Sequence, residues 1–209
     1  MTTTAVIVAG GSGTRFGHPK HNELLGGIEL WQRSVDAFSA TRVHDIIVVG
    51  DVPGGVPGGP RRRDSVASGL SAVPAGTEWV MIHDAARPLV TQGLIERVLE
   101  RLLHGDVDGV IPAVHLTDTI KRVDGNSVIE TVDRATLVAV QTPQAFRLAV
   151  LQDAFANDQL DATDDAAMVE RNGGTVVFVM GDPMNIKITI PEDLAIARAY
   201  LANAADGHD

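Results

Sequence analysis

A glycine-rich turn near the N-terminus is the first segment whose residue types could do chemistry. Ala9 ends a short apolar run, and Gly10, Gly11 and Gly13 follow it. Glycines at a strand-to-helix turn let backbone N–H groups approach a phosphate closely. Because a tight turn of purely structural character also favours glycine, phosphate binding and a structural role both stay open from this segment alone.

Two cations follow the turn at a spacing of five residues, Arg15 and Lys20. Fixed cations beside a phosphate turn stabilise the charge of a polyphosphate, although two solvated surface residues would give the same pattern. Phe16 stands where a dinucleotide-binding fingerprint requires its third glycine, and the Gly-Lys-Ser/Thr of a P-loop is absent. The segment therefore predicts a nucleotide site of another kind.

An acid and a base end a second apolar run, over residues 81–88. Open α/β sheets bind ligands beyond the carboxyl ends of their strands, which is where Asp84 and Arg87 fall. A carboxylate there could hold Mg²⁺ while phosphates supply further oxygen ligands, and the alternative is an Asp84–Arg87 surface ion pair. His83 is interpreted as a packed, hydrogen-bonded histidine, and no HxxxH spacing suggests a histidine metal site.

The surrounding pattern predicts the elements that position these residues. Short apolar runs bounded by Gly or Pro predict buried strands over residues 5–9, 46–49, 79–82, 109–114 and 176–180. Apolar residues at helical spacing predict helices over residues 30–39, 64–72, 94–103 and 192–202. Thr91 is the expected N-cap of the third helix, and Thr189 and Glu192 have the spacing of a capping box for the fourth. Strands alternating with helices predict a three-layer α/β sheet.

Two segments interrupt the alternation. Residues 51–60 contain three Pro and four Gly and predict a loop. Residues 114–142 alternate β-favouring and polar residues around Asp-Gly-Asn at 124–126, and predict a hairpin that projects from the sheet. A projecting hairpin usually needs a partner surface to be stable. Residues 163–165 are interpreted as the cap of a short helix over residues 166–170.

Composition limits the possible functions. A chain of 209 residues is expected to form one domain over residues 1–209, and 17 Lys and Arg against 27 Asp and Glu give a net charge of −10. This charge opposes binding to nucleic acid or an anionic membrane. The absence of Cys excludes thiolate zinc sites and cysteine nucleophiles, and no run of eighteen apolar residues could span a bilayer. Without a signal-peptide pattern at residues 1–10, the expected location is the cytoplasm.

Several ordered motifs together resemble those of the 2-C-methyl-D-erythritol 4-phosphate cytidylyltransferases of the non-mevalonate isoprenoid pathway. The motifs are the glycine-rich segment 9–15 with Pro19-Lys20, the segment 58–66 with its two glycines, arginines and Ser-Val, His-Asp-Ala-Ala-Arg-Pro at 83–88, and residues 118–121, 132–134, 141–144, 163–165 and 185–189. The resemblance covers nearly the whole chain, and residues 83–88 are its most specific part.

The resemblance implies a three-layer Rossmann-like nucleotidyltransferase sheet, mostly parallel, with a projecting β-hairpin at about residues 114–142 that acts as a dimerisation arm. It implies that the phosphate of methylerythritol phosphate attacks the α-phosphorus of CTP and that pyrophosphate leaves. A phosphate nucleophile is largely ionised near neutral pH and needs no general base. The implied cofactor is Mg²⁺ or another divalent cation, and the implied partner is a second copy of the chain.

Site residues are carried over position by position. The catalytic group comprises Arg15, Lys20, Arg134 and Lys187, with Asp84 as the metal ligand. The nucleotide-binding group comprises Ala9, Gly10, Gly11, Gly13, Gly58, Gly59, Ser65, Asp84 and Ala85. The substrate-binding group comprises Asp84, Arg87, Thr119, Arg134, Thr142 and Lys187, of which Thr119 and Arg134 would reach the partner's site. From the residues alone, Lys187 in its strand-like stretch and the arginines at 61–63 could also be solvated surface residues. In the resemblance, Arg62 is the one that matches the family arginine.

Some features depart from the family pattern and leave alternatives open. His21 and Asn22 follow Lys20 where the family usually has Gln and an aromatic residue, and Pro60 stands at a position that is often acidic. The five-residue spacing of Arg15 and Lys20 is similar to that of molybdenum-cofactor nucleotidyltransferases. The alternatives are therefore a cytidylyltransferase for ribitol phosphate or another polyol phosphate, a molybdopterin nucleotidyltransferase, and a nonenzymatic nucleotide-binding protein of the same fold.

Overall fold

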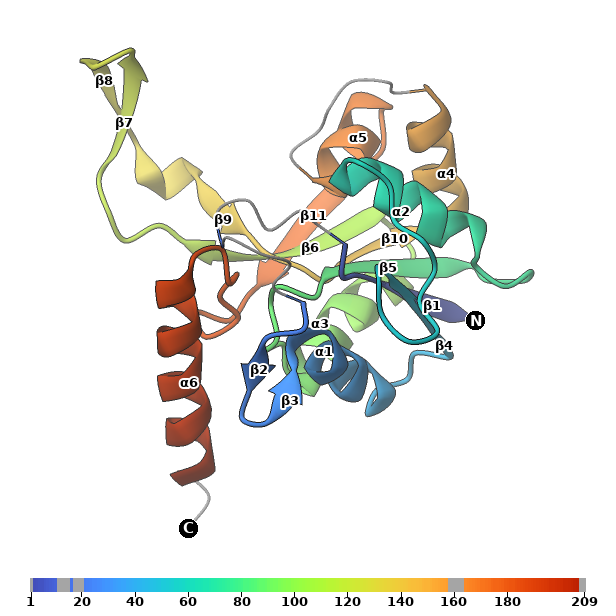
Figure 1. Ribbon diagram of the computed structural model, residues 1–209. Helices are drawn as coiled ribbons and strands as arrows, with labels where there is room; N and C mark the ends of the chain where they lie inside the picture. The colour runs from blue at the N-terminus through green and yellow to red at the C-terminus, as the bar shows by residue number, and fades with distance from the viewer. Residues whose placement is uncertain (1, 11–15, 17–20, 158–163, 207–209) are drawn as a thin grey trace.

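A seven-stranded sheet forms the centre of the computed structural model, which describes residues 2–10, 16, 21–157 and 164–206 (Figure 1). Its strands are β1 (Thr3–Val8), β4 (Asp45–Val49), β5 (Trp79–Asp84), β6 (Gly109–His115), β9 (Val138–Val140), β10 (Gln144–Arg147) and β11 (Val176–Met180). The spatial order is β11-β6-β10-β5-β1-β4, and β9 pairs with β6 beside this path. All five strands predicted from the sequence are confirmed.

Five of these strands run in the same direction. β1 is parallel to β4 and β5, and β11 is parallel to β6. β10 lies antiparallel between β5 and β6, and β9 is antiparallel to β6. The expected mostly parallel sheet is confirmed, and β10 is the strand that joins its two parallel parts.

Helices cover both faces of the sheet and complete the predicted three layers (Figure 1). On one face lie α1 (Leu30–Ser39) and α3 (Gln92–Leu103), and on the other lie α2 (Arg62–Ser71), α4 (Leu148–Asn157) and α5 (Asp165–Arg171). Ala5 and Ile7 of β1 pack toward the first pair, and Val6 and Val8 pack toward the second group. A strand buried on both faces explains the continuous apolar run in the sequence.

The C-terminal helix α6 (Pro191–Asp206) lies beside a small hairpin formed by β2 (Leu24–Leu25) and β3 (Ile28–Glu29). A separate apolar cluster that includes Leu25, Ile188 and Leu194 joins them. The predicted Thr189–Glu192 capping box is replaced by another contact: Asp193 Oδ2 accepts from the N–H groups of residues 189 and 190, at 2.7 and 3.0 Å. Asp193 is one residue closer to the helix interior and reaches back to both donors.

Residues 114–142 form the projecting arm with one correction to its extent (Figure 1). Strands β7 (Ile120–Asp124) and β8 (Ser127–Val132) make the antiparallel hairpin around Gly125, whose φ is 54°. Both ends of the predicted segment belong instead to the main sheet, as the end of β6 and as β9, and a short 3-10 turn (Arg134–Thr136) precedes β9. The hairpin exposes Val123, Val128 and Ile129 to solvent.

The glycine- and proline-rich residues 51–60 form the predicted loop, apart from one isolated bridge between Val49 and Val56. The helix after this loop, α2, packs closely on the sheet at Gly69. A Cβ atom added at Gly69 would lie 2.4 Å from Cγ1 of Val6 and 2.9 Å from Cγ2 of Val49. Within the part of the chain that the structure describes, no helix is long and apolar enough to cross a membrane.

Candidate active site

Asp84, the last residue of β5, lies at the centre of a buried ion cluster. Its Oδ1 accepts a hydrogen bond from Arg62 Nε at 2.9 Å, and its Oδ2 lies 2.6 Å from Lys187 Nζ. The side chain is 10% exposed; burial raises its pKa, but Arg62 and Lys187 more than offset this and hold the pKa of Asp84 well below its usual range. Asp84 is therefore an ionised carboxylate at the edge where the parallel strands end.

A second carboxylate extends the cluster. Arg62, the first residue of α2, donates from Nη2 to Asp165 Oδ2 at 2.8 Å, and the Asp165 side chain is 0% exposed. Burial raises the pKa of Asp165 and Arg62 offsets only part of that rise, but the 2.8 Å contact with a permanently charged guanidinium favours the carboxylate form. Two carboxylates and two cations thus alternate in the order Asp165, Arg62, Asp84, Lys187. The sequence pattern placed Arg62 at a partly solvated helix start and did not identify Asp165 as part of the site.

A hydrogen-bonded chain behind Asp84 uses the predicted residue Thr142. The Thr142 hydroxyl accepts from the N–H of Asp84 at 3.1 Å and lies 3.1 Å from His83 Nδ1. His83 Nε2 lies 3.3 Å from the carbonyl of Arg87, so Nε2 carries the proton and Nδ1 accepts from Thr142. Complete burial lowers the pKa of His83 to about 4, so this histidine is neutral and packed, as predicted.

Arg87 ties three segments together beside the cluster. Its Nη1 donates to the carbonyl of Asn185 at 2.8 Å, and its Nη2 donates to the carbonyl of Val140 at 3.3 Å. Asn185 in turn donates to the carbonyl of Thr142 at 2.9 Å. The alternative Asp84–Arg87 ion pair is therefore not formed, because Arg62 and Lys187 occupy the Asp84 oxygens. Residues 185–189 form a loop rather than the strand that their alternation suggests, and this loop carries Lys187.

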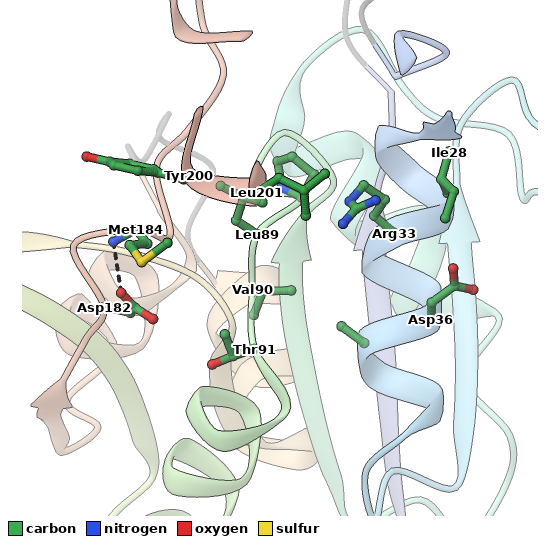
Figure 2. Close-up of a pocket in the computed structure, with 12 residues that line it drawn as sticks. Ile28, Arg33, Asp36, Leu89, Val90, Thr91, Asp182, Met184, Tyr200 and Leu201 are labelled. Carbon is green, nitrogen blue, oxygen red and sulfur yellow. Dashed lines mark hydrogen bonds between the residues drawn. The ribbon is translucent and has the colours of Figure 1, made fainter. Parts of the chain in front are cut away.

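A hollow of about 260 Å³ opens over the cluster. It is lined by Arg62, Asp84, Arg87, Val140, Gln141, Thr142, Gln144, Asp164 and Lys187. A second hollow of about 300 Å³, shown in Figure 2, lies between α1, α6 and the loop after β5. Its lining is largely apolar and contains one cation, Arg33, so of these two hollows the first is the better suited to phosphate groups.

The described residues of the predicted nucleotide-binding group lie near the carboxyl ends of β1, β4 and β5, and among them Asp84 lines the hollow. Ser65 Oγ accepts from the N–H of Gly59 at 3.1 Å, and a Cβ atom added at Gly58 or Gly10 would lie 3.0 or 3.5 Å from the same oxygen. The N–H of Ala9 donates to the carbonyl of Val49, and the N–H of Ala85 donates to that of Val8. Four further predicted residues lie outside the described residues, namely Gly11, Gly13, Arg15 and Lys20.

Thr119 and Arg134 lie on the arm and do not line the hollow of their own chain. Both residues are exposed, and Arg134 Nη1 donates to the carbonyl of Thr117. This placement is the one expected for residues that would serve a partner's site, and that role stays a prediction.

Two carboxylates, Asp84 and Asp164, line the hollow, and Asp84 stands in the position predicted for a metal ligand. Among the described residues, no group of three or more His, Asp or Glu side chains could hold a metal ion without other ligands. Mg²⁺ commonly uses one or two carboxylates together with substrate phosphates and water. The ionised Asp84 therefore fits a cation that is bound jointly with a nucleotide.

A mostly parallel sheet that brings glycine backbone, an ionised carboxylate and two cations to one edge has the features that a nucleotidyltransferase requires. The family model described as 2-C-methyl-D-erythritol 4-phosphate cytidylyltransferase (IspD) matches residues 3–203. The chain belongs to this family.

Curated relatives agree with the family assignment. The enzyme of this name from Rubrobacter xylanophilus is 43% identical, over 95% of this chain and 94% of its own length. The one from Streptomyces coelicolor is 39% identical, over 96% and 85%. A bifunctional enzyme IspD/IspF from Solidesulfovibrio magneticus is 42% identical over 93% of this chain, which spans only about half (56%) of that relative's length.

Solved structures agree as well. The 4-diphosphocytidyl-2C-methyl-D-erythritol synthase of Anaerococcus prevotii superposes with a TM-score of 0.84 at 28% identity, over 96% of both chains. The 2-C-methyl-D-erythritol 4-phosphate cytidylyltransferase of Thermus thermophilus gives a TM-score of 0.81 at 32% identity, over 96% of this chain and 98% of that chain. The likeness extends over nearly the full length of this chain.

Proposed function

We propose that this protein transfers CMP from CTP to 2-C-methyl-D-erythritol 4-phosphate and releases pyrophosphate, in the synthesis of isoprenoid precursors. The observation that carries the proposal is the ion cluster around Asp84 at the sheet edge, whose Arg62 lies on the same helix as Ser65. Membership of the family over residues 3–203 supports the choice of substrates.

In this reaction a phosphate oxygen of the acceptor forms a bond to the α-phosphorus of CTP, and the bond from that phosphorus to the bridging oxygen of pyrophosphate breaks. The nucleophile is already ionised near neutral pH, so no residue has to remove a proton. This fits a site whose histidine is neutral, buried and engaged at both ring nitrogens.

The position of each residue would determine its role in the reaction. Lys187, whose side chain is 41% exposed, lies at the mouth of the hollow and would hold the incoming phosphate near the α-phosphorus. Arg15 and Lys20 would stabilise the charge on the α-phosphate and on the departing pyrophosphate. Asp84 would hold Mg²⁺, which when bound neutralises phosphate charge. Ser65 and the glycine backbones around it would contact cytidine, with Arg87 and Thr142 on the polyol side.

The exposed arm would complete the site in a homodimer. Thr119 and Arg134 would reach the substrate phosphate in the active site of the second copy, so that two chains share each site. The apolar side chains exposed on the hairpin support this role, because an isolated two-stranded hairpin gains stability from a surface that covers it.

Pyrophosphate release in the presence of Mg²⁺ tests the proposal. CTP, GTP, ATP and UTP are each combined with methylerythritol phosphate, ribitol phosphate or molybdopterin. We expect release with CTP and methylerythritol phosphate alone. Release with another pair would assign a different acceptor or nucleotide to the same fold, and release with none would favour a nucleotide-binding protein without this activity.

A further inference from the structure

Arg62 divides one edge of its guanidinium between two carboxylates. Nε and Nη2 are two parallel donors with which an arginine commonly binds a single carboxylate in a bidentate pair. Here Nε donates to Asp84 at 2.9 Å and Nη2 donates to Asp165 at 2.8 Å. Because Nη2 donates to Asp165, Arg62 makes one hydrogen bond to Asp84 in place of two.

The sheet and a helix start hold Asp165 in place. Gln144 on β10 donates from Nε2 to Asp164 Oδ2 at 2.8 Å, and its Oε1 accepts from the N–H of Ala166 at 3.1 Å. Both chain neighbours of Asp165 are thus anchored to one side chain of the central sheet. Asp165 is fully buried, and its Oδ1 has no hydrogen-bond partner among the described residues, so Arg62 is its principal contact.

Without the Asp165 charge, Arg62 would be free to turn both donors onto Asp84. A bidentate pair would occupy Oδ2 of Asp84, the oxygen that now lies 2.6 Å from Lys187 Nζ. A planar guanidinium held by two hydrogen bonds would then replace the flexible Lys187 side chain, which is 41% exposed and can move off Oδ2 when a cation binds. The position of the whole cluster therefore depends on Asp165, although Asp165 does not line the hollow.

We propose that Asp165 is a positioning residue of the transfer reaction: it holds Arg62 at Nη2, limits this arginine to one oxygen of Asp84, and keeps the other oxygen available to Lys187 and to the divalent cation. This inference rests on the proposed function for the identity of the substrates. Its evidence is independent of them, because it consists of the contacts of Arg62 with two carboxylates.

The test compares Asp165→Asn, which has the same shape without the charge, with the unaltered protein. One readout is the Mg²⁺ concentration that gives half of the maximal rate of pyrophosphate release. The other is calorimetric binding of a non-hydrolysable CTP analogue across a range of Mg²⁺ concentrations. We expect Asp165→Asn to raise the Mg²⁺ requirement in both by about tenfold or more, the range typical of losing a residue behind a metal ligand.

A double variant separates positioning from simple loss of structure. Adding Arg62→Met to Asp165→Asn removes the arginine that would otherwise capture Asp84, so the Mg²⁺ requirement of analogue binding should return most of the way to that of the unaltered protein. Leu99→Ala, in the core on the far face of the sheet, is the control for lowered stability. It should lower resistance to urea and leave the Mg²⁺ requirement unchanged.

An unchanged Mg²⁺ requirement in Asp165→Asn, or a double variant that binds no better than the single one, would overturn the inference. A wild-type protein that binds the analogue and releases no pyrophosphate would instead refute the proposed function. In that case the Mg²⁺ dependence of analogue binding in the variants would still decide the role of Asp165.

Discussion

The close packing of α2 on the sheet makes Gly69→Ala an informative substitution. Helix propensity alone predicts that alanine would stabilise a helix by about 1 kcal/mol relative to glycine. The added Cβ would lie 2.4 Å from Val6 Cγ1 and 2.9 Å from Val49 Cγ2, and both valines are fully buried in the central sheet. Since neither valine can move freely, the helix must shift, and overpacking of this kind costs about 1 to 3 kcal/mol.

We expect the steric cost to exceed the propensity gain, so that Gly69→Ala lowers the free energy of unfolding by up to about 2 kcal/mol. Gly93→Ala is the matched control, because Gly93 is also helical and nothing lies within 4 Å of an added Cβ. That substitution should leave stability unchanged or raise it by up to about 1 kcal/mol. Urea-induced unfolding of both variants measures the difference.

A Gly69→Ala protein as stable as the unaltered one would refute this account of α2 packing. The substitution also tests the site, because α2 carries Arg62 and Ser65. A shift of the helix should lower the rate of pyrophosphate release as well as stability, whereas Gly93→Ala should leave the rate unaffected.

Three further predictions concern charge. Burial lowers the pKa of His83 from 6.5 to about 4, so between these pH values the unfolded chain binds more protons than the folded one. The free energy of unfolding should therefore fall by about 3 kcal/mol as the pH drops from 6.5 to 4. His83→Gln should remove this part of the pH dependence in unfolding curves measured at several pH values. Lys187→Ala should lower turnover by at least about a hundredfold while thermal unfolding stays within a few degrees, and normal turnover would remove Lys187 from the mechanism. If the arm is exchanged between subunits, mixing inactive Arg134→Ala and Lys187→Ala proteins should restore about one working site per mixed dimer, and no recovery after verified exchange would contradict a shared site.

Sequence patterning predicts the elements that are separated by turn signals and misses those that are not. Residues 144–157 contain β10 followed at once by α4, with no glycine, proline or polar turn between them. The spacing of apolar residues changes there from that of a strand to that of a helix, with no turn residue in between. Periodicity alone therefore does not separate the two elements. The same effect merged the ends of β6 and β9 into the predicted arm, because all of these residues favour strands.

Some residues of the candidate site could likewise be predicted from the sequence, and others could not. Asp84 was identified because an acid directly follows a buried strand, and this signal depends only on neighbouring residues. The link from Arg62 to Asp165 spans 103 residues and depends on two helices starting at the same sheet edge. Each residue has a sufficient local explanation, as a helix-start arginine and as an acid in the first turn of a helix. Only the tertiary arrangement shows that they meet.

The central position of β10 has a consequence for how the protein is synthesised. β4, β1 and β5 belong to residues 3–84 and can pair as soon as they leave the ribosome, whereas β5 and β6 have no common neighbour until residues 144–147 follow. A nascent chain that ends earlier carries β4-β1-β5 and, apart from it, β6 with β9, and each part has an open edge that invites pairing with other chains. The ion cluster forms later still, since Lys187 follows β11 in the chain. Residues 144–187 therefore have to be translated after β10 begins before this active centre can exist.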